Sequence, residues 1–195
     1  EIYAAKEDMN AALEIGKEYL KEASDPSEKV RMHRRIADLY LSISKFAEAE
    51  AAMNEALKLN AGNAGLWQTL GHCLSRQNKV HEALQGFERA NDIAPNDDGI
   101  LYDIGDAFLA LGQPEKAIEV LEKAVRLNPD YSLAHYDLSL AYFDLERYPE
   151  AEKSARAALL DDPDMAFQSS NLGLGATDNL GIALMNQGKM EEAEA

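Results

Sequence analysis

The amino-acid sequence predicts an all-α protein made of repeated helix pairs. Three observations predict this fold: a 34-residue period of small and apolar residues, apolar spacings of three and four residues within each period, and turn-forming residues between the stripes. In the copy at 98–131, Leu101, Ile104 and Phe108 form one helical stripe, and a second stripe follows the turn at residues 112–114. With 46% hydrophobic residues in 195, the chain has enough apolar material for a folded core.

The same small and apolar residues recur in phase through four consecutive copies. Each copy supplies four positions to a first helix and three to a second, and a proline or polar turn closes most copies. The positions are His33, Ile36, Ala37, Tyr40, Ala49, Met53 and Ala56; Trp67, Leu70, Gly71, Leu74, Ala83, Phe87 and Ala90; Leu101, Ile104, Gly105, Phe108, Ala117, Leu121 and Ala124; His135, Leu138, Ser139, Tyr142, Ala151, Ala155 and Ala158.

This period and these positions resemble the tetratricopeptide repeat (TPR), closely over residues 30–165 and loosely at both ends. The resemblance implies a right-handed TPR superhelix, an α-solenoid of antiparallel helix pairs that acts as a binding scaffold. The expected division is a degenerate or truncated repeat at 1–29, repeats at 30–63, 64–97, 98–131 and 132–165, and an irregular insertion plus a partial repeat at 166–195.

Small residues at fixed positions indicate close helix contacts within each pair. Gly71 and Gly105 are expected to let the first helix approach the second, and Ala83, Ala117 and Ala151 to do the same from the other side. A single pair cannot bury both of its faces, so each repeat is expected to pack on its neighbours.

The two ends of the chain are less regular. Over residues 1–29, Tyr3 and Ala4 fit the Leu-Gly position of a truncated first helix, and Gly16, Leu20 and Ala23 keep the spacing of a second helix. Because both ends fall inside repeats, we expect either a piece of a longer array or terminal segments that have been lost or are disordered.

The step into the last repeat is eight residues too long, since Gly181 follows Ser139 by 42 residues. The extra residues lie in Ala166–Gly173. Two interpretations stay open: a lengthened first helix that carries both Leu172 and Leu180, or a loop favoured by the local serines and glycines.

Composition narrows the function classes. The net charge of −16 disfavours nucleic acid as a partner, and no apolar run is long enough for a transmembrane helix. The charge is uneven: residues 30–63 have a net charge of +1, and residues 132–165 a net charge of −5. A charged partner would be oriented along the chain by this difference in charge. The expected location is cytoplasmic, with peripheral attachment to a membrane through partners as a further option.

No pattern of catalytic residues is present. The four histidines form neither an HExxH motif nor a zinc pattern, and no phosphate-binding loop or nucleophile elbow is found. The single cysteine, Cys73, excludes a disulfide framework and is expected to be a small packing residue. We therefore expect no catalytic residues, no metal, no cofactor and no enzymatic activity.

The TPR resemblance implies that the first helix of each pair lines a concave groove. The implied groove is basic in the first two repeats and aromatic or aliphatic in the later ones, where an exposed apolar patch would indicate an interaction site. The alternative is that a further helix of the same chain covers this patch. The expected partner-binding residues are Arg31, Arg34, His72, Arg76, Tyr102, Leu109, Leu133, Tyr136, Leu140 and Phe143.

The most favoured function is a non-enzymatic scaffold that binds an apolar or amphipathic segment of a protein partner in this groove. The positions that TPR proteins use to grip the acidic C-terminal tails of chaperones do not match, so such tails are not expected as partners. Two alternatives stay open. One is a self-assembling scaffold on a membrane or organelle surface, as in a magnetosome coat, and the other is a regulatory domain of a larger enzyme.

Overall fold

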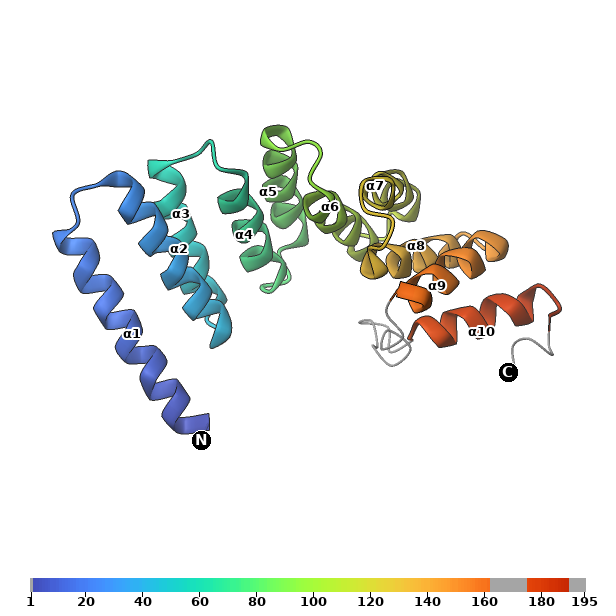
Figure 1. Cartoon of the computed structure of the whole chain (residues 1–195), viewed down its shortest axis with the longest axis horizontal. Helices are drawn as coiled ribbons and strands as arrows, with labels where there is room; N and C mark the ends of the chain where they lie inside the picture. The colour runs from blue at the N-terminus through green and yellow to red at the C-terminus, as the bar shows by residue number, and fades with distance from the viewer. Residues whose placement is uncertain (1, 162–174, 190–195) are drawn as a thin grey trace. The chain divides into compact units, whose positions relative to one another are not determined.

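A computed structural model describes residues 2–161 and 175–189 of the chain, and within these residues it contains ten helices and no strand (Figure 1). This result confirms the all-α fold class. The helices are α1 (Ile2–Glu22), α2 (Pro26–Ser42), α3 (Phe46–Leu59), α4 (Ala64–Ser75), α5 (Val80–Ile93), α6 (Asp98–Ala110), α7 (Pro114–Leu127), α8 (Ser132–Asp144), α9 (Tyr148–Asp161) and α10 (Ala176–Asn186).

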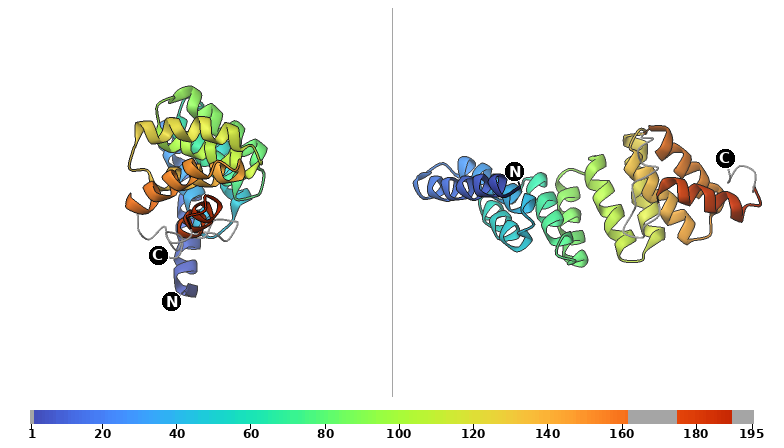
Figure 2. Two further views of the ribbon diagram at one scale, coloured as in Figure 1. Left: turned by 90° about the vertical axis from the view of Figure 1, so that its right-hand side faces the viewer. Right: turned by 90° about the horizontal axis from the view of Figure 1, so that it is seen from below.

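The chain forms two compact units, Glu1–Pro95 with α1 to α5 and Asn96–Ala195 with α6 to α10. In each unit, every helix packs on the next one along the chain (Figure 2). In the second unit, α8 also contacts α6 and α10, which lie one helix further away in sequence. Neighbour packing of this kind is typical of repeat proteins.

The turns inside the helix pairs share one backbone feature. Residues 44, 78 and 112, each 34 residues from the next, all adopt a left-handed conformation, with φ of 58° at Ser44, 61° at Asn78 and 66° at Gly112. Glu146 continues the series with φ 57°, and Gly188, 42 residues later, closes it with φ 76°. The backbone therefore keeps the repeat even where the amino acid at the turn changes.

Two glycines make the close helix contacts that the sequence predicts. A Cβ atom at Gly105 in α6 would lie 2.5 Å from Cγ of Leu121 in α7, and one at Gly71 in α4 would lie 2.4 Å from Cε1 of Phe87 in α5. Both distances are far below van der Waals contact, so a side chain at either glycine would force the neighbouring helix or its side chain to move. Gly181 in α10 differs, because a Cβ there would meet no atom of the described residues within 4 Å.

A side-chain clamp joins α4 to α3 in the first unit. The Gln77 amide, after the end of α4, donates to Oε2 of Glu50 at 2.8 Å and to the main-chain oxygen of Phe46 at 3.3 Å. Lys79 forms an ion pair with the same Glu50 oxygen at 2.9 Å. These bonds fix the turn inside one pair against the second helix of the pair before it.

The same clamp recurs in the second unit across the irregular step. Gln187 donates to Oε2 of Glu152 at 3.0 Å and to the main-chain oxygen of Tyr148 at 3.3 Å, and Lys189 pairs with Glu152 at 2.8 Å. Glu152 follows its counterpart in the first clamp by 102 residues, which is three periods, whereas Gln187 follows its counterpart by 110. The eight extra residues are therefore taken up between α9 and the end of α10.

The irregular ends are only partly described. α1 runs unbroken from Ile2 to Glu22, so this stretch is one helix, and its assignment to a degenerate repeat stays a prediction. Residues 166–173, for which the sequence left open a loop or a lengthened helix, lie outside the described residues. α10 begins at Ala176, after an extended Gly175 whose main-chain N–H donates to Asp178 at 2.9 Å.

Candidate functional site

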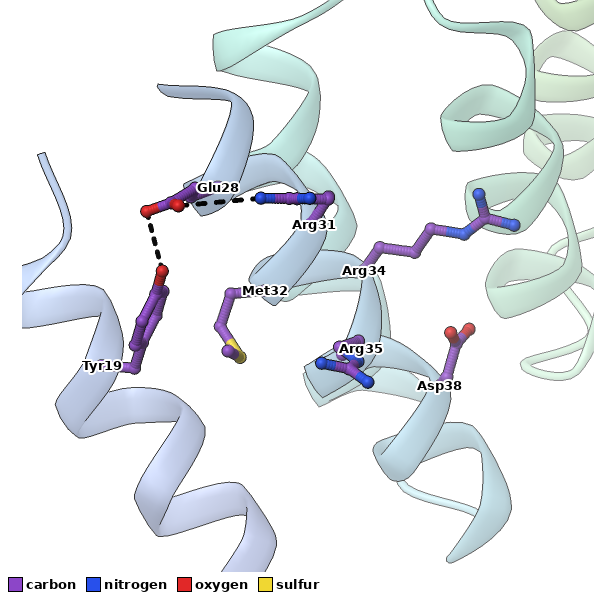
Figure 3. A pocket seen from close by; sticks show the side chains of 7 residues that line it. All are labelled: Tyr19, Glu28, Arg31, Met32, Arg34, Arg35 and Asp38. Carbon is purple, nitrogen blue, oxygen red and sulfur yellow. Dashed lines mark hydrogen bonds and ion pairs between the residues drawn. The ribbon is translucent and has the colours of Figure 1, made fainter. Parts of the chain in front are cut away.

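The first unit carries a pocket of about 700 Å³ between α1 and α2. We call it the arginine pocket. It forms because α1 packs beside α2 while five charged residues of α2, spaced by helical intervals, line the space beside it. Its lining residues are Tyr19, Glu28, Arg31, Met32, Arg34, Arg35 and Asp38 (Figure 3).

One carboxylate of the chain already binds inside the arginine pocket. The Tyr19 hydroxyl donates to Oε2 of Glu28 at 2.8 Å, and the Arg31 guanidinium lies 3.7 Å from the other Glu28 oxygen (Figure 3). The hydrogen bond to Glu28 raises the pKa of Tyr19. Met32 points into the space between the two helices and gives the pocket an apolar floor.

Arg34 and Arg35 complete the positive side of the arginine pocket. Arg34 extends toward α4, where its Nη1 lies 3.8 Å from the position that a Cβ at Gly65 would take (Figure 3). Among the residues that the structure describes, no carboxylate lies within ion-pair distance of Arg34 or Arg35. Both guanidinium groups are exposed and available to an external anion.

The other two expected site residues of the first unit contact aromatic rings of their own chain. The His72 ring lies edge-on to Phe87 with 5.2 Å between centroids, and the Arg76 guanidinium lies 5.0 Å from the centre of the Phe46 ring. Such contacts keep the His72 and Arg76 side chains packed on rings of the same chain. Neither residue lines the arginine pocket.

The second unit brings aromatic and acidic side chains together on α6 and α8. We call this the aromatic–acidic cluster: Tyr102, Asp103 and Asp106 from α6, Tyr131 just before α8, and Asp137 from α8. The rings of Tyr102 and Tyr131 lie 5.1 Å apart between centroids. Both rings are half-buried and pack against the hydrophobic core of the unit.

Asp137 is the most unusual member of the aromatic–acidic cluster. Its residue surface is only 6% exposed, and its Oδ2 has no hydrogen-bond partner among the described residues. Burial raises the pKa of Asp137 well above its usual value, and the nearby charge of Asp106 raises it further. Burial, together with the nearby aspartates, also raises the pKa of Tyr131 to about 12. A buried carboxyl group without a partner is costly, and groups of this kind concentrate at functional sites.

The apolar residues expected to line the groove are less exposed than the sequence suggested. Leu133 is 39% exposed, while Leu109, Leu140 and Phe143 are half-buried against the core clusters of the unit. The Phe143 ring contacts Tyr148 at 5.8 Å between centroids. This region therefore offers partial apolar surfaces and not a fully exposed patch.

Tyr136 corrects the sequence interpretation. Its expected place was an exposed groove, but it is only 6% exposed and belongs to a buried cluster with Ala158 of α9 and Ala176 of α10. α10 packs on both α8 and α9, so the start of this helix covers the ring. The covering helix lies in the partial repeat expected at 166–195, so Tyr136 lies in a contact between neighbouring repeats and not on an open face.

Several residues of both sites escaped the sequence analysis. Arg35 could have been found, because Arg31, Arg34 and Arg35 show the spacing of one helix face. Tyr19 lies on α1, where the repeat pattern is too weak to align, and Met32 has no charge or motif to mark it. The burial of Asp137 depends on neighbouring helices and leaves no signal in the local sequence.

The described residues contain no group of three His, Cys, Asp or Glu side chains arranged to hold a metal ion. Cys73 is fully buried, and burial raises its pKa to about 11, so its thiol is a poor nucleophile at neutral pH. Across residues 2–161 and 175–189, no helix is both long enough and apolar enough to span a bilayer.

Comparisons with known proteins agree with this architecture. Profiles of the tetratricopeptide repeat match residues 44–102 and 77–123 in one case and 102–166 in another. The tetratricopeptide repeat-containing protein trd-1 of Caenorhabditis elegans is 27% identical over 116 residues, which are 58% of this chain and 15% of the relative. The chain thus spans less than a fifth of that relative's length.

Solved structures match most of the chain. The crystal structure of MamA has a TM-score of 0.75 at 21% identity and covers 86% of this chain and 87% of its own. YrrB, described as a TPR protein with an unusual peptide-binding site, has a TM-score of 0.71 at 22% identity and covers 91% and 86%. The helix pairs, the recurring turns and the matched profiles lead to one conclusion: the chain belongs to the tetratricopeptide repeat family.

Proposed function

We propose that this chain is a protein-interaction scaffold that binds an apolar or amphipathic segment of a partner on its concave face, along α6 and α8. The family and fold are typical of protein-interaction scaffolds without enzymatic activity. The observation that carries the finer proposal is the row of partly exposed apolar side chains on these two helices, namely Tyr102, Leu109, Leu133 and Phe143. A location in the cytoplasm is part of the proposal.

The proposed mode of binding follows from the surface chemistry. A partner that covers the Tyr102 and Tyr131 rings removes apolar area from water, and aromatic anchors commonly contribute about 2 kcal/mol or more to such interfaces. The similarity to YrrB, a TPR protein with a peptide-binding site, supports a peptide segment as the ligand class.

The test is capture of partners by the full chain, followed by affinity measurement with each variant. Tyr102→Ala and Leu133→Ala are expected to weaken binding by about tenfold or more while circular dichroism stays unchanged. Leu127→Ala is the matched control, because Leu127 is an equally apolar residue of α7 with 47% exposure. If Leu127→Ala weakens binding and the two groove variants do not, the proposed surface is wrong.

The uneven charge favours self-association as a second candidate function. Residues 1–95 carry 12 Lys and Arg against 15 Asp and Glu, and residues 96–195 carry 7 against 20. Both halves are acidic, but α2 carries four Lys and Arg against two acidic residues, so two copies could pair α2 of one with the acidic second unit of the other, although the net charge of −16 makes whole chains repel each other. Light scattering over a concentration series distinguishes the two functions, since a constant mass rejects self-association. A regulatory role inside a larger enzyme would require a catalytic domain elsewhere in the full-length protein.

A further inference from the structure

We propose that the arginine pocket between α1 and α2 is a recognition site for acidic side chains of a partner protein segment. This inference rests on the proposed scaffold function, and it adds the chemical class of ligand that the first unit selects. The ligand is an internal stretch of chain in which Asp or Glu residues flank an apolar side chain.

The charge of α2 is the first observation. With four Lys and Arg against Glu28 and Asp38, α2 is the one helix among those described whose net charge is positive. Three of its cations, Arg31, Arg34 and Arg35, line the pocket. Two of these guanidinium groups have no ion-pair partner among the described residues. Because the chain has 35 acidic residues, such a concentrated cationic surface points to an anion from outside the chain.

The carboxylate of Glu28 is the second observation. Tyr19 and Arg31 hold this group from two sides, at 2.8 Å and 3.7 Å, so the pocket wall already shows carboxylate recognition. Arg34 and Arg35 extend from the same helix, and neither forms an ion pair with a carboxylate of the described residues, although Asp38 also lines the pocket. A guanidinium presents donors in a planar fork that matches a carboxylate, and such charge-assisted pairs give binding strength together with directional specificity.

The apolar residues and the charge balance of the pocket restrict the chemical class of the ligand further. Met32 and the Tyr19 ring supply apolar contact on the α1 side of α2, while Arg34 extends toward α4, so the pocket suits a segment that presents an apolar side chain and acidic side chains at separate points. With three arginines against Glu28 and Asp38, the charged groups that line the pocket sum to +1, which matches one singly charged carboxylate better than a phosphate dianion. A protein segment with Asp or Glu therefore fits the pocket better than a phosphate group or a phospholipid surface does.

The probe is a fluorescein-labelled ten-residue peptide with the central sequence Glu-Glu-Leu-Glu-Glu, blocked at both termini so that it has no terminal carboxylate. Its control is the same peptide with glutamine at every glutamate. Fluorescence anisotropy with the full chain is expected to show about tenfold tighter binding of the glutamate peptide at low salt, and weaker binding as salt rises. Equal affinities for the two peptides would overturn the proposal.

Two double variants locate the binding site. Arg34→Ala with Arg35→Ala is expected to reduce glutamate-peptide affinity by about tenfold or more. The control is Lys123→Ala with Lys153→Ala, two exposed cations of the second unit whose loss changes the net charge by the same amount. Arg34→Lys with Arg35→Lys keeps the charge and removes the planar fork, so an intermediate loss is expected. An equal loss in the control variant would attribute binding to the overall charge and reject the pocket.

A third arm tests the lipid alternative with vesicles of phosphatidylcholine and phosphatidylserine. Binding to these vesicles that depends on Arg34 and Arg35, in the absence of peptide binding, would overturn the proposal. The test of the arginine pocket and the test of the scaffold function can fail independently, because capture of a partner through Tyr102 and Leu133 does not require the arginine pocket. If that capture persists while the peptide fails to bind, only the present inference is wrong.

Discussion

At the scale of single residues, the glycine position of the repeat has a different role in different helices. Gly105 lies where any side chain would overlap Leu121. Gly181 holds the equivalent position of α10, where an added Cβ would have no atom of the described residues within 4 Å. Adding a side chain at this glycine of the repeat is therefore expected to destabilise α6 but not α10.

The first prediction compares these two glycines. Gly105→Leu is expected to lower the free energy of unfolding by more than about 2 kcal/mol, because the added atoms force α6 away from α7. Gly181→Ala is expected to raise it by about 0.5–1 kcal/mol, because alanine is the better helix former. Chemical denaturation measures both changes. A loss of stability in Gly181→Ala would show that α10 is more tightly packed there than the structure indicates.

The second prediction concerns Asp137. Its folded pKa lies above the unfolded value of about 3.9, so the stabilisation from its protonated form is complete below that pH and is lost as pH rises through the folded pKa. Asp137→Asn is expected to raise the free energy of unfolding at pH 7 by about 1 kcal/mol or more and to flatten its dependence on pH. The exposed Asp130→Asn is the control in parallel denaturation curves at pH 5 and 7. Unchanged stability in Asp137→Asn would mean that its carboxyl group finds compensation in the fold.

At the scale of helices and turns, the recurring left-handed residue shows what the sequence period encodes. The glycine at 112 suits this backbone, but Ser44, Asn78 and Glu146 adopt it as well. A residue with a Cβ in this conformation costs about 1–2 kcal/mol, which the two flanking helices must offset. These turns are therefore places where the fold constrains the backbone more strongly than the local residue does.

The third prediction tests this constraint. Glu146→Gly is expected to raise the free energy of unfolding by about 0.5–1 kcal/mol, because it removes the left-handed strain at φ 57°. Gly112→Ala is expected to lower it by about 1 kcal/mol, and through the backbone alone, since none of the described atoms lies within 4 Å of its added Cβ. Thermal unfolding followed by circular dichroism measures both. The same direction of change in the two variants would contradict the argument.

Much of the fold could be predicted at this scale, but less of the candidate site. The period located the helix pairs and the Gly105 contact, since both depend on residues one helix apart. It could not predict the burial of Tyr136, because the eight-residue step decides where Ala176 lies against it. The arginine pocket also needs α1, whose sequence does not show the repeat clearly. The prediction failed where distant or irregular segments determine the surroundings.

At the scale of the whole molecule, the excess of negative charge opposes compactness. The second unit, residues 96–195, contains 20 acidic and 7 basic residues, so like charges repel throughout it. Ion pairs such as Glu152 with Lys189 act in the other direction. The balance between these effects determines how salt changes stability.

The fourth prediction follows from that balance. Raising NaCl from about 20 mM to about 500 mM is expected to raise the thermal midpoint, because screening weakens the general repulsion more than it weakens the few short ion pairs. Calorimetry at the two salt concentrations measures the shift. The variant Lys189→Ala, which lacks one of those ion pairs, is expected to show a larger rise. A midpoint that falls with salt would show that the ion pairs dominate.

The neighbour-to-neighbour packing within each unit also has a consequence for how the protein is made. Because each helix buries its apolar face against the one synthesised just before it, the loops that close during folding are short and their entropy cost is small. A nascent chain can therefore cover each new apolar stripe soon after it leaves the ribosome. The clamps of Glu50 and Glu152 need the turn that follows the next helix. Each clamp can therefore join the two helices only after that next helix has been completely synthesised.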